Sequence, residues 1–179
     1  MAGESLSKCS FAALVEPLAA FAHVCLLQPG LPRFHSDARN IVYARHLDST
    51  LPELQEACRD AERIFFVCFS LGGHALLEFL HRNLDVTDTI SGIAFIDAVV
   101  NNLHQYDKKF QRHIRDLSVH WRASDEPLDQ RIASEDGILT LSAGDLNHDT
   151  LAANCFPSTT RWIHERTKLQ KDAISCAIG

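Results

Sequence analysis

Residues 64–73 read Ile64-Phe65-Phe66-Val67-Cys68-Phe69-Ser70-Leu71-Gly72-Gly73, an apolar run that leads into a serine and two glycines. An uninterrupted apolar run of this length predicts a buried strand. The following residues, up to Leu84, have helical periodicity, with Leu76 and Leu80 on the apolar face. The segment therefore predicts a strand that passes directly into a helix.

The same alternation continues on both sides of this segment. Apolar runs predict strands at 23–27, 90–96 and 138–142, and helical patterns predict helices over 11–21, 36–47, 50–63, 108–117 and 158–171. Strands that alternate with helices predict an α/β fold, with a mostly parallel sheet between two helical layers. In such sheets, ligands and catalytic groups gather beyond the carboxyl ends of the strands.

Length and composition indicate one ordinary globular domain. The chain has 179 residues, of which 46% are hydrophobic and 22% charged, which is close to the globular average. We expect a polar N-terminal segment at 1–10, one domain over 11–173 and a tail at 174–179. Residues 11–28 could imitate a signal peptide, but Glu16, Pro17 and His23 interrupt the apolar stretch, which favours a helix followed by a strand.

Cysteine and histidine usage favours an intracellular protein without a metal. The six cysteines are Cys9, Cys25, Cys58, Cys68, Cys155 and Cys176, and they form no C-x-x-C pair. Such scattered thiols are typical of a reducing compartment. The ten histidines do not combine with cysteines at the spacing of a structural zinc site. Gly72-Gly73 is not a phosphate-binding G-x-G-x-x-G motif, so we expect no cofactor.

The residues around Ser70 approximate the nucleophile elbow G-x-S-x-G. Gly72 occupies the second glycine position, and Cys68 stands in place of the first. An elbow needs small residues here because strand and helix approach closely around a strained serine. It would present the Ser70 hydroxyl at a helix N-terminus, with the Leu71 amide as an oxyanion donor. The alternative is a tight turn without chemistry.

Two further strand ends carry residues that could complete a catalytic triad. Asp97 follows the strand at 90–96, and His148 lies in a predicted loop after the strand at 138–142. Serine, acid and histidine in this order are expected of an α/β-hydrolase, with Ser70 as nucleophile, His148 as base and Asp97 orienting the base. Asp97 could instead cap a helix or accept a hydrogen bond from a loop amide. Asp145 is a competing acid in the loop of His148, and His104 and Glu126 are further candidates.

Four motifs in the same order resemble the Argonaute-binding-protein-two (Arb two) domain, and its animal cotranscriptional-regulator branch most closely. They are Phe65-Phe66-Val67-Cys68-Phe69-Ser70-Leu71-Gly72-Gly73, the stretch Ile96-Asp97-Ala98-Val99-Val100-Asn101-Asn102-Leu103-His104-Gln105, the segment from Trp121 through Ser124-Asp125-Glu126-Pro127-Leu128-Asp129, and Ser142-Ala143-Gly144 through His148 with Phe156-Pro157-Ser158. The resemblance extends from about Phe11 to the final helix.

The resemblance implies a three-layer α/β-hydrolase-like fold in proteins linked to Argonaute, RNA silencing, heterochromatin and splicing regulation. Ser70, Asp97 and His148 fall on the family's triad-like positions. Cys68 and Phe69 replace the alanine and histidine that usually precede the serine. The family's earlier strand, whose His-Gly loop would lend a second oxyanion amide, has no counterpart, so we expect a domain shortened at its N-terminus. Losing one oxyanion donor costs about 2.7–4 kcal/mol of transition-state stabilisation.

These considerations predict a protein-interaction or regulatory domain on a hydrolase-like scaffold, with weak or no catalysis. The alternative is a serine hydrolase, an esterase or acyl-transfer enzyme. The resemblance implies Argonaute-type proteins or chromatin and splicing factors as partners. It also implies a nuclear location, whereas the residues themselves indicate only an intracellular protein, in the nucleus, the cytoplasm or both. The net charge of −6 opposes direct nucleic-acid binding. Basic residues on two predicted helices are interpreted as solvated faces: Lys108, Lys109, Arg112, His113, Arg115, Arg161, Arg166, Lys168 and Lys171.

Overall fold

The computed structural model describes residues 18–19, 63–87 and 89–178, and the side chains of these residues up to 168. Its elements are β1 (Ile64–Phe69), α4 (Gly72–Arg82), α5 (Leu84–Thr87), β2 (Ile90–Ile96), η1 (Leu103–Gln105), α6 (Lys108–Leu117), β3 (Ser118–Arg122), β4 (Leu139–Ser142) and α7 (His148–Ile178). The strand predicted at 23–27 and the helices predicted over 36–47 and 50–63 lie outside the described residues, as does most of the helix predicted over 11–21.

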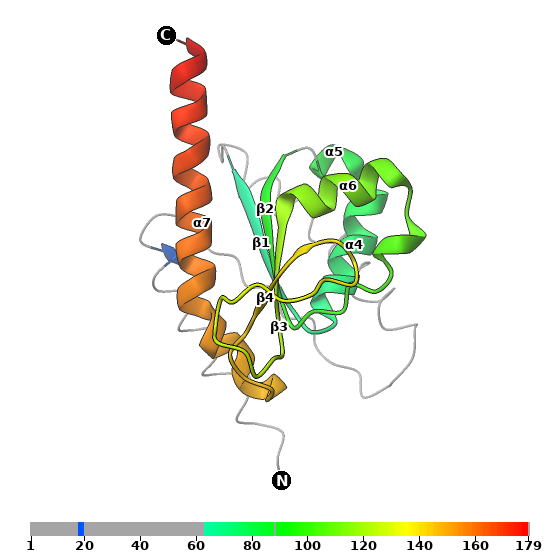
Figure 1. The fold of residues 1–179 in the computed structure, drawn as a ribbon. Coiled ribbons are helices and arrows are strands. Elements are labelled where there is room, and N and C mark those ends of the chain that lie inside the picture. The colour runs from blue at the N-terminus through cyan, green and yellow to red at the C-terminus, as the bar shows by residue number, and fades with distance from the viewer. Residues whose placement is uncertain (1–17, 20–62, 88, 179) are drawn as a thin grey trace.

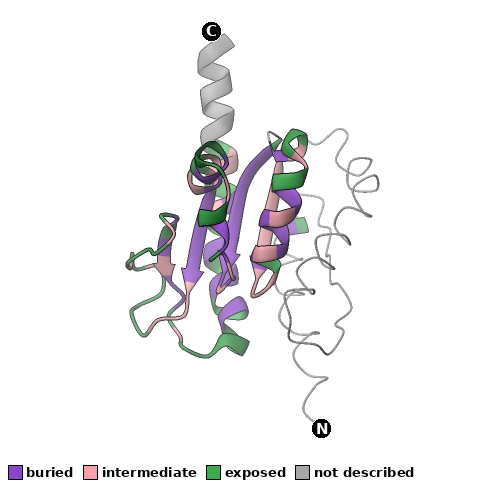
Figure 2. Ribbon diagram, turned by 90° about the vertical axis from the view of Figure 1, so that its right-hand side faces the viewer, coloured by how far each residue is buried: buried purple, intermediate pink, exposed green. Residues whose placement is uncertain are grey.

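The described strands form one parallel sheet in the order β1-β2-β3-β4. Helices α4 and α6 lie on one face and α7 on the other (Figure 1). The predicted α/β architecture with a parallel sheet is therefore confirmed for this part of the chain. Every residue of β2 is buried, because helices cover both faces of this central strand (Figure 2).

Each face of the sheet carries its own apolar core. The first core joins side chains of α4 and α6 to the sheet and includes Phe79, Phe95 and Ile114, none of which is exposed. The second core lies under α7 and includes Trp121 and Cys155. These two cores fix both helical layers on the sheet, because burial of apolar surface is the main favourable contribution to folding.

Helix α6 has the predicted bounds. Asp107 caps its N-terminus by accepting hydrogen bonds from the backbone nitrogens of Lys109 and Phe110, at 2.9 and 3.0 Å. These donors, that of Phe110 above all, lower the pKa of the Asp107 carboxyl below its ordinary value. The cap explains why the helix begins at Lys108.

Strand β3 was absent from the sequence-based prediction. Its sequence, SVHWR, contains a histidine and an arginine and lacks the continuous apolar run of the other strands. The strand is nevertheless buried, and two of its side chains form hydrogen bonds with distant segments: Trp121 Nε1 donates to Asp129 Oδ1 at 2.8 Å, and His120 Nε2 accepts from the backbone nitrogen of Ala98 at 3.2 Å. Burial of polar groups is tolerated where they are hydrogen-bonded.

Helix α7 begins ten residues before the predicted start at Ser158, so His148 is its first residue and does not lie in a loop. Proline is unfavourable inside a helix, because it lacks a backbone N–H and disturbs the preceding turn. The helix nevertheless continues through Pro157. The packing of Leu151, Ala152 and Cys155, each at most 2% exposed, holds the turns before the proline against the sheet.

Gly73 is needed for the approach of α4 to the chain after β2. A Cβ atom at this position would lie 2.9 Å from Ala98 Cβ and 3.0 Å from the carbonyl oxygen of Val99. A Cβ atom at the neighbouring Gly72 would lie 3.9 Å from Cys68 Cβ, an ordinary contact. Gly73, rather than the elbow glycine, is therefore the sterically constrained position.

We expect Gly73→Ala to lower the free energy of unfolding by about 1–3 kcal/mol, the usual cost of overpacking. Gly72→Ala is the matched control and should cause no such loss. Urea denaturation followed by circular dichroism measures both variants. Equal stability of the two variants would contradict this account of the α4 contact.

Candidate functional site

The candidate site lies at the carboxyl edge of the parallel sheet. Ser70 directly follows β1, Asp97 directly follows β2, and His148 opens α7 after the loop that leaves β4. The register pairs Phe69 with Ile96 and Ile96 with Trp121, so the ends of the first three strands are level. The topology thus places Ser70 and Asp97 on neighbouring strand ends at one edge.

Ser70 has the left-handed backbone conformation of a nucleophile elbow, with φ at 53°. Its amide donates to the carbonyl oxygen of Ile96 at 3.3 Å, and its carbonyl oxygen accepts from the backbone nitrogen of Val99 at 2.8 Å. A non-glycine residue with positive φ is strained and persists only when its surroundings hold it. Even a Cβ atom built on Gly72 would lie 3.9 Å from Cys68 Cβ, so cysteine fits the first glycine position of the motif.

Asp97 and His148 form a direct side-chain pair. Asp97 Oδ2 lies 2.5 Å from His148 Nδ1, and Asp97 Oδ1 accepts from the backbone nitrogen of Ala123 at 3.3 Å. The ring of Phe69 stacks on the imidazole, with 4.5 Å between ring centroids and an interplanar angle of 21°. Phe69 thus supports the position of the His148 ring.

The arrangement of Asp97 and His148 leaves Nε2 as the imidazole nitrogen that could act as a base. The imidazole side chain is 44% exposed and the carboxylate side chain 24% exposed. Among the described residues, no hydrogen bond joins Ser70 Oγ to His148. The Leu71 amide, the expected oxyanion donor, immediately precedes α4 and has no acceptor among these residues.

The competing candidates have other partners. Asp145 accepts hydrogen bonds from Thr150 Oγ1 at 2.6 Å and from the Asn147 amide at 3.0 Å, and these donors, Thr150 first, lower the pKa of its carboxyl. Glu126 accepts from Gln130 Nε2 at 2.9 Å. His104 lies in η1, exposed to solvent. Within the described part of the chain, Asp97 is the acid that contacts His148.

Asp129 joins two of the motifs that carry the family resemblance. Its carboxylate accepts from Trp121 Nε1 at 2.8 Å, from Ser158 Oγ at 2.7 Å and from Arg161 at 3.0 Å. It therefore ties the loop after β3 to both β3 and α7. The sequence contained the motifs but no signal that they meet, because Asp129 and Ser158 are 29 positions apart.

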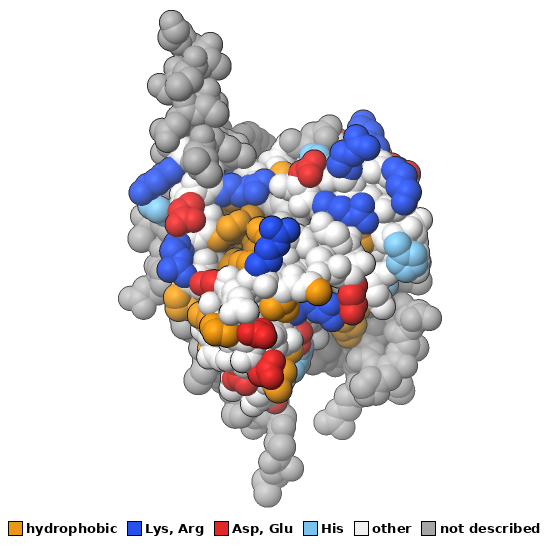
Figure 3. All heavy atoms as spheres, in the orientation of Figure 1, with side chains coloured by type: hydrophobic (Ala, Val, Ile, Leu, Met, Phe, Trp, Pro, Cys, Tyr) orange, Lys and Arg blue, Asp and Glu red, His pale blue; other side chains and the backbone are white. Residues whose placement is uncertain are grey.

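The described residues show neither a metal cluster nor a membrane span. No three His, Cys, Asp or Glu side chains among them are arranged to hold a metal ion. None of the helices in the described ranges is long and apolar enough to cross a membrane. On the face seen in Figure 3, Lys and Arg side chains are spread among acidic and uncharged groups.

The fold and the site define an α/β protein whose parallel sheet carries a serine in a left-handed turn and a hydrogen-bonded Asp–His pair at its carboxyl edge. Comparison with curated proteins shows that the chain is similar to the animal cotranscriptional regulators ARB2A. It is 31% identical over 121 residues to the human protein and 30% identical over 120 residues to the chicken homologue. The resemblance inferred from the motifs is thereby confirmed.

The similarity is partial in length. The matched residues make up 66% of this chain for the human and mouse proteins, and the chain covers 29% of the length of these relatives. No protein-family model matches the chain. No solved structure matches it either.

We expect Asp129→Ala to lower the free energy of unfolding by about 1–3 kcal/mol, because it leaves the buried Trp121 N–H without an acceptor. Asp125→Ala, a change at an exposed acid in the same loop, should have little effect. Denaturation curves recorded by tryptophan fluorescence measure both changes. An unaltered midpoint for Asp129→Ala would refute the role of Asp129 as a clamp.

Proposed function

We propose that this chain is a regulatory domain that acts during transcription by binding a protein partner at the carboxyl edge of its sheet. The observation that carries the proposal is the similarity to proteins named cotranscriptional regulators, at 31% identity over 121 residues. The proposed partners are Argonaute-type proteins or chromatin and splicing factors, and the proposed location is the nucleus. The scaffold would be hydrolase-like.

The surface around the site supports partner binding. Leu146, two residues before His148, is 67% exposed, and Leu128 is 40% exposed. A Cβ atom at Gly144 would lie 3.1 Å from Leu128 Cβ, so the loops that carry the two leucines are in contact. Exposed apolar side chains on loops that meet can form part of a surface that contacts other molecules. The proposed surface therefore consists of Leu128, Leu146 and the exposed part of His148.

Tethering the chain to a reporter gene tests this proposal. Fusion to a sequence-specific DNA-binding domain should change nascent transcript output or the spliced fraction, compared with the untethered chain. Leu146→Asp should reduce the effect because it places a charge on the proposed surface, whereas Leu84→Asp, at another exposed leucine (57% exposed), should not. The proposal fails if tethering leaves the reporter RNA unchanged.

A serine hydrolase is the second candidate, and one arrangement favours it. Ser70 has the elbow conformation, and Asp97 holds His148 through Nδ1. In such a reaction, His148 Nε2 would take the proton from the Ser70 hydroxyl while Oγ attacks a substrate carbonyl, and the Leu71 amide would donate to the developing oxyanion. A second oxyanion amide has not been identified in the described residues. The expected rate is therefore lowered by a factor of about 10²–10³.

Fluorophosphonate labelling distinguishes the two candidates. Because only one oxyanion donor is identified, we expect the wild-type protein to label no faster than the Ser70→Ala variant. Circular dichroism verifies that each protein is folded. Labelling of the wild type that disappears in both Ser70→Ala and His148→Ala would establish an assembled nucleophile and base, and would favour the hydrolase.

A further inference from the structure

His120 is a buried polar residue of β3 that the candidate mechanism does not use. It is 2% exposed, and its ring lies against that of Phe95, with 5.9 Å between ring centroids. Burying an imidazole in an apolar layer is unfavourable unless its nitrogens are partnered. The partners of His120 therefore indicate why a histidine stands at this position.

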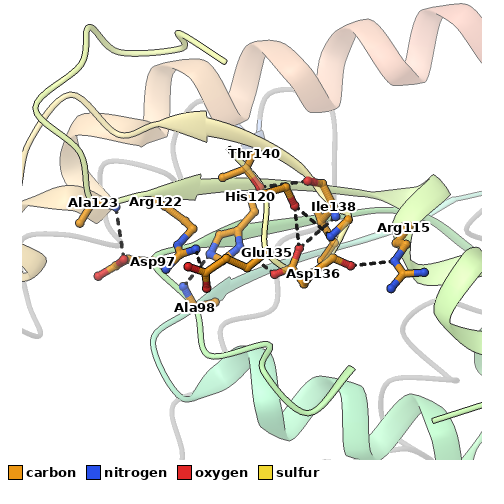
Figure 4. Close-up of polar contacts among 12 residues, drawn as sticks. Asp97, Ala98, Arg115, His120, Arg122, Ala123, Glu135, Asp136, Ile138 and Thr140 are labelled. Atoms are coloured by element: carbon orange, nitrogen blue, oxygen red, sulfur yellow. Dashed lines mark hydrogen bonds and ion pairs between the residues drawn. The ribbon is translucent and has the colours of Figure 1, made fainter. Parts of the chain in front are cut away.

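The two ring nitrogens of His120 face different groups (Figure 4). Nε2 lies 3.2 Å from the backbone nitrogen of Ala98, and a backbone N–H can only donate, so Nε2 is the acceptor. The proton of the neutral ring is then on Nδ1, which lies 3.9 Å from Asp136 Oδ2, beyond hydrogen-bond distance, and has no hydrogen-bond partner in the described part of the chain. The negative charge of Asp136 favours this tautomer.

Asp136 is itself held in place. Its Oδ1 accepts from Ser134 Oγ at 3.1 Å and from the Ile138 amide at 3.0 Å, and its carbonyl oxygen accepts from Arg115 Nε at 2.7 Å. Burial opposes its ionisation, but the His120 ring and these donors outweigh burial and lower the pKa of its carboxyl. The nearby Arg122 pairs with Glu135, at 3.4 Å.

The contact of His120 with Ala98 lies next to the strained residue of the site. Asp97 has a φ of 41°, a left-handed conformation that a non-glycine residue rarely adopts. Its own amide donates to the carbonyl oxygen of Trp121 at 2.7 Å, and the following amide donates to His120. Two consecutive residues of β3 therefore hold this turn. Trp121 accepts from the Asp97 amide through its carbonyl oxygen, and His120 accepts from the Ala98 amide through its ring.

We propose that His120 is a positioning residue: through the Ala98 amide it stabilises the left-handed turn that directs the Asp97 carboxylate to His148. The β3 carbonyls of Trp121 and Arg122 already accept from the amides of Asp97 and Ala143. This role of His120 matters for function only through the proposed site, so the inference rests on the proposed function. The experiment that tests it is measured in the free protein and does not depend on that function.

The readout is the tautomer of His148, measured by long-range ¹H–¹⁵N correlation at a pH alkaline enough for a neutral imidazole. In the wild type, the carboxylate of Asp97 should hold the proton on Nδ1. His120→Gln offers an oxygen near the position of Nε2 and should keep this tautomer. His120→Asn is one methylene shorter and cannot reach the Ala98 amide, so the preference for the Nδ1–H tautomer should be lost.

Retention of the Nδ1–H tautomer in a folded His120→Asn protein would overturn the proposal. Its loss in both variants would also overturn it, because the ring, and not the acceptor, would then be required. If His120→Asn does not fold, the same correlation spectrum of the wild type tests the hydrogen bond itself. An unprotonated His120 Nε2 with a scalar coupling to the Ala98 amide nitrogen supports the proposal. A protonated Nε2 refutes it. Failure of the reporter experiment alone would refute the proposed function and leave these results unaffected.

Discussion

The hydrogen bonds that continue the parallel sheet one residue beyond its strands hold the whole site together. The amide of Ser70 donates to Ile96, that of Asp97 to Trp121, and that of Ala143 to Arg122. These bonds extend the register of the buried strands to the residues that follow them. Two of those residues, Ser70 and Asp97, have positive φ. The strain at these turns is sustained because the buried core on both faces fixes the strands.

Both candidate functions use the same geometry, but hydrolysis makes further demands on it. A binding surface needs the loops around His148 to be held in place, which Asp97, Phe69 and the Asp129 clamp accomplish. Hydrolysis needs, in addition, a second amide that faces the oxyanion. Transition-state stabilisation depends on such preorganised donors, and the loss of one costs about 2.7–4 kcal/mol.

Much of the fold could be predicted from patterns of apolar residues. Strands β1, β2 and β4 and helix α6 follow from apolar runs and helical periodicity. Strand β3 could not be predicted in this way, because His120 and Arg122 interrupt the apolar pattern. The burial of His120 and Trp121 depends on hydrogen-bond partners elsewhere in the chain. The predicted start of α7 was wrong: the helix begins at His148 and continues through Pro157, because tertiary packing of the preceding turns outweighs the local cost of the proline.

The sequence by itself determined the α/β class and the candidate residues Ser70, Asp97 and His148 at the ends of successive elements, since both depend on local patterns. Only the tertiary structure decided which acid contacts His148. Asp97 is 51 positions away from it, whereas Asp145, three positions away, is bound to Thr150 and Asn154. The structure also assigned contacts to His120 and Asp129. Hydrogen bonds between distant segments depend on register and packing, which local patterns do not encode.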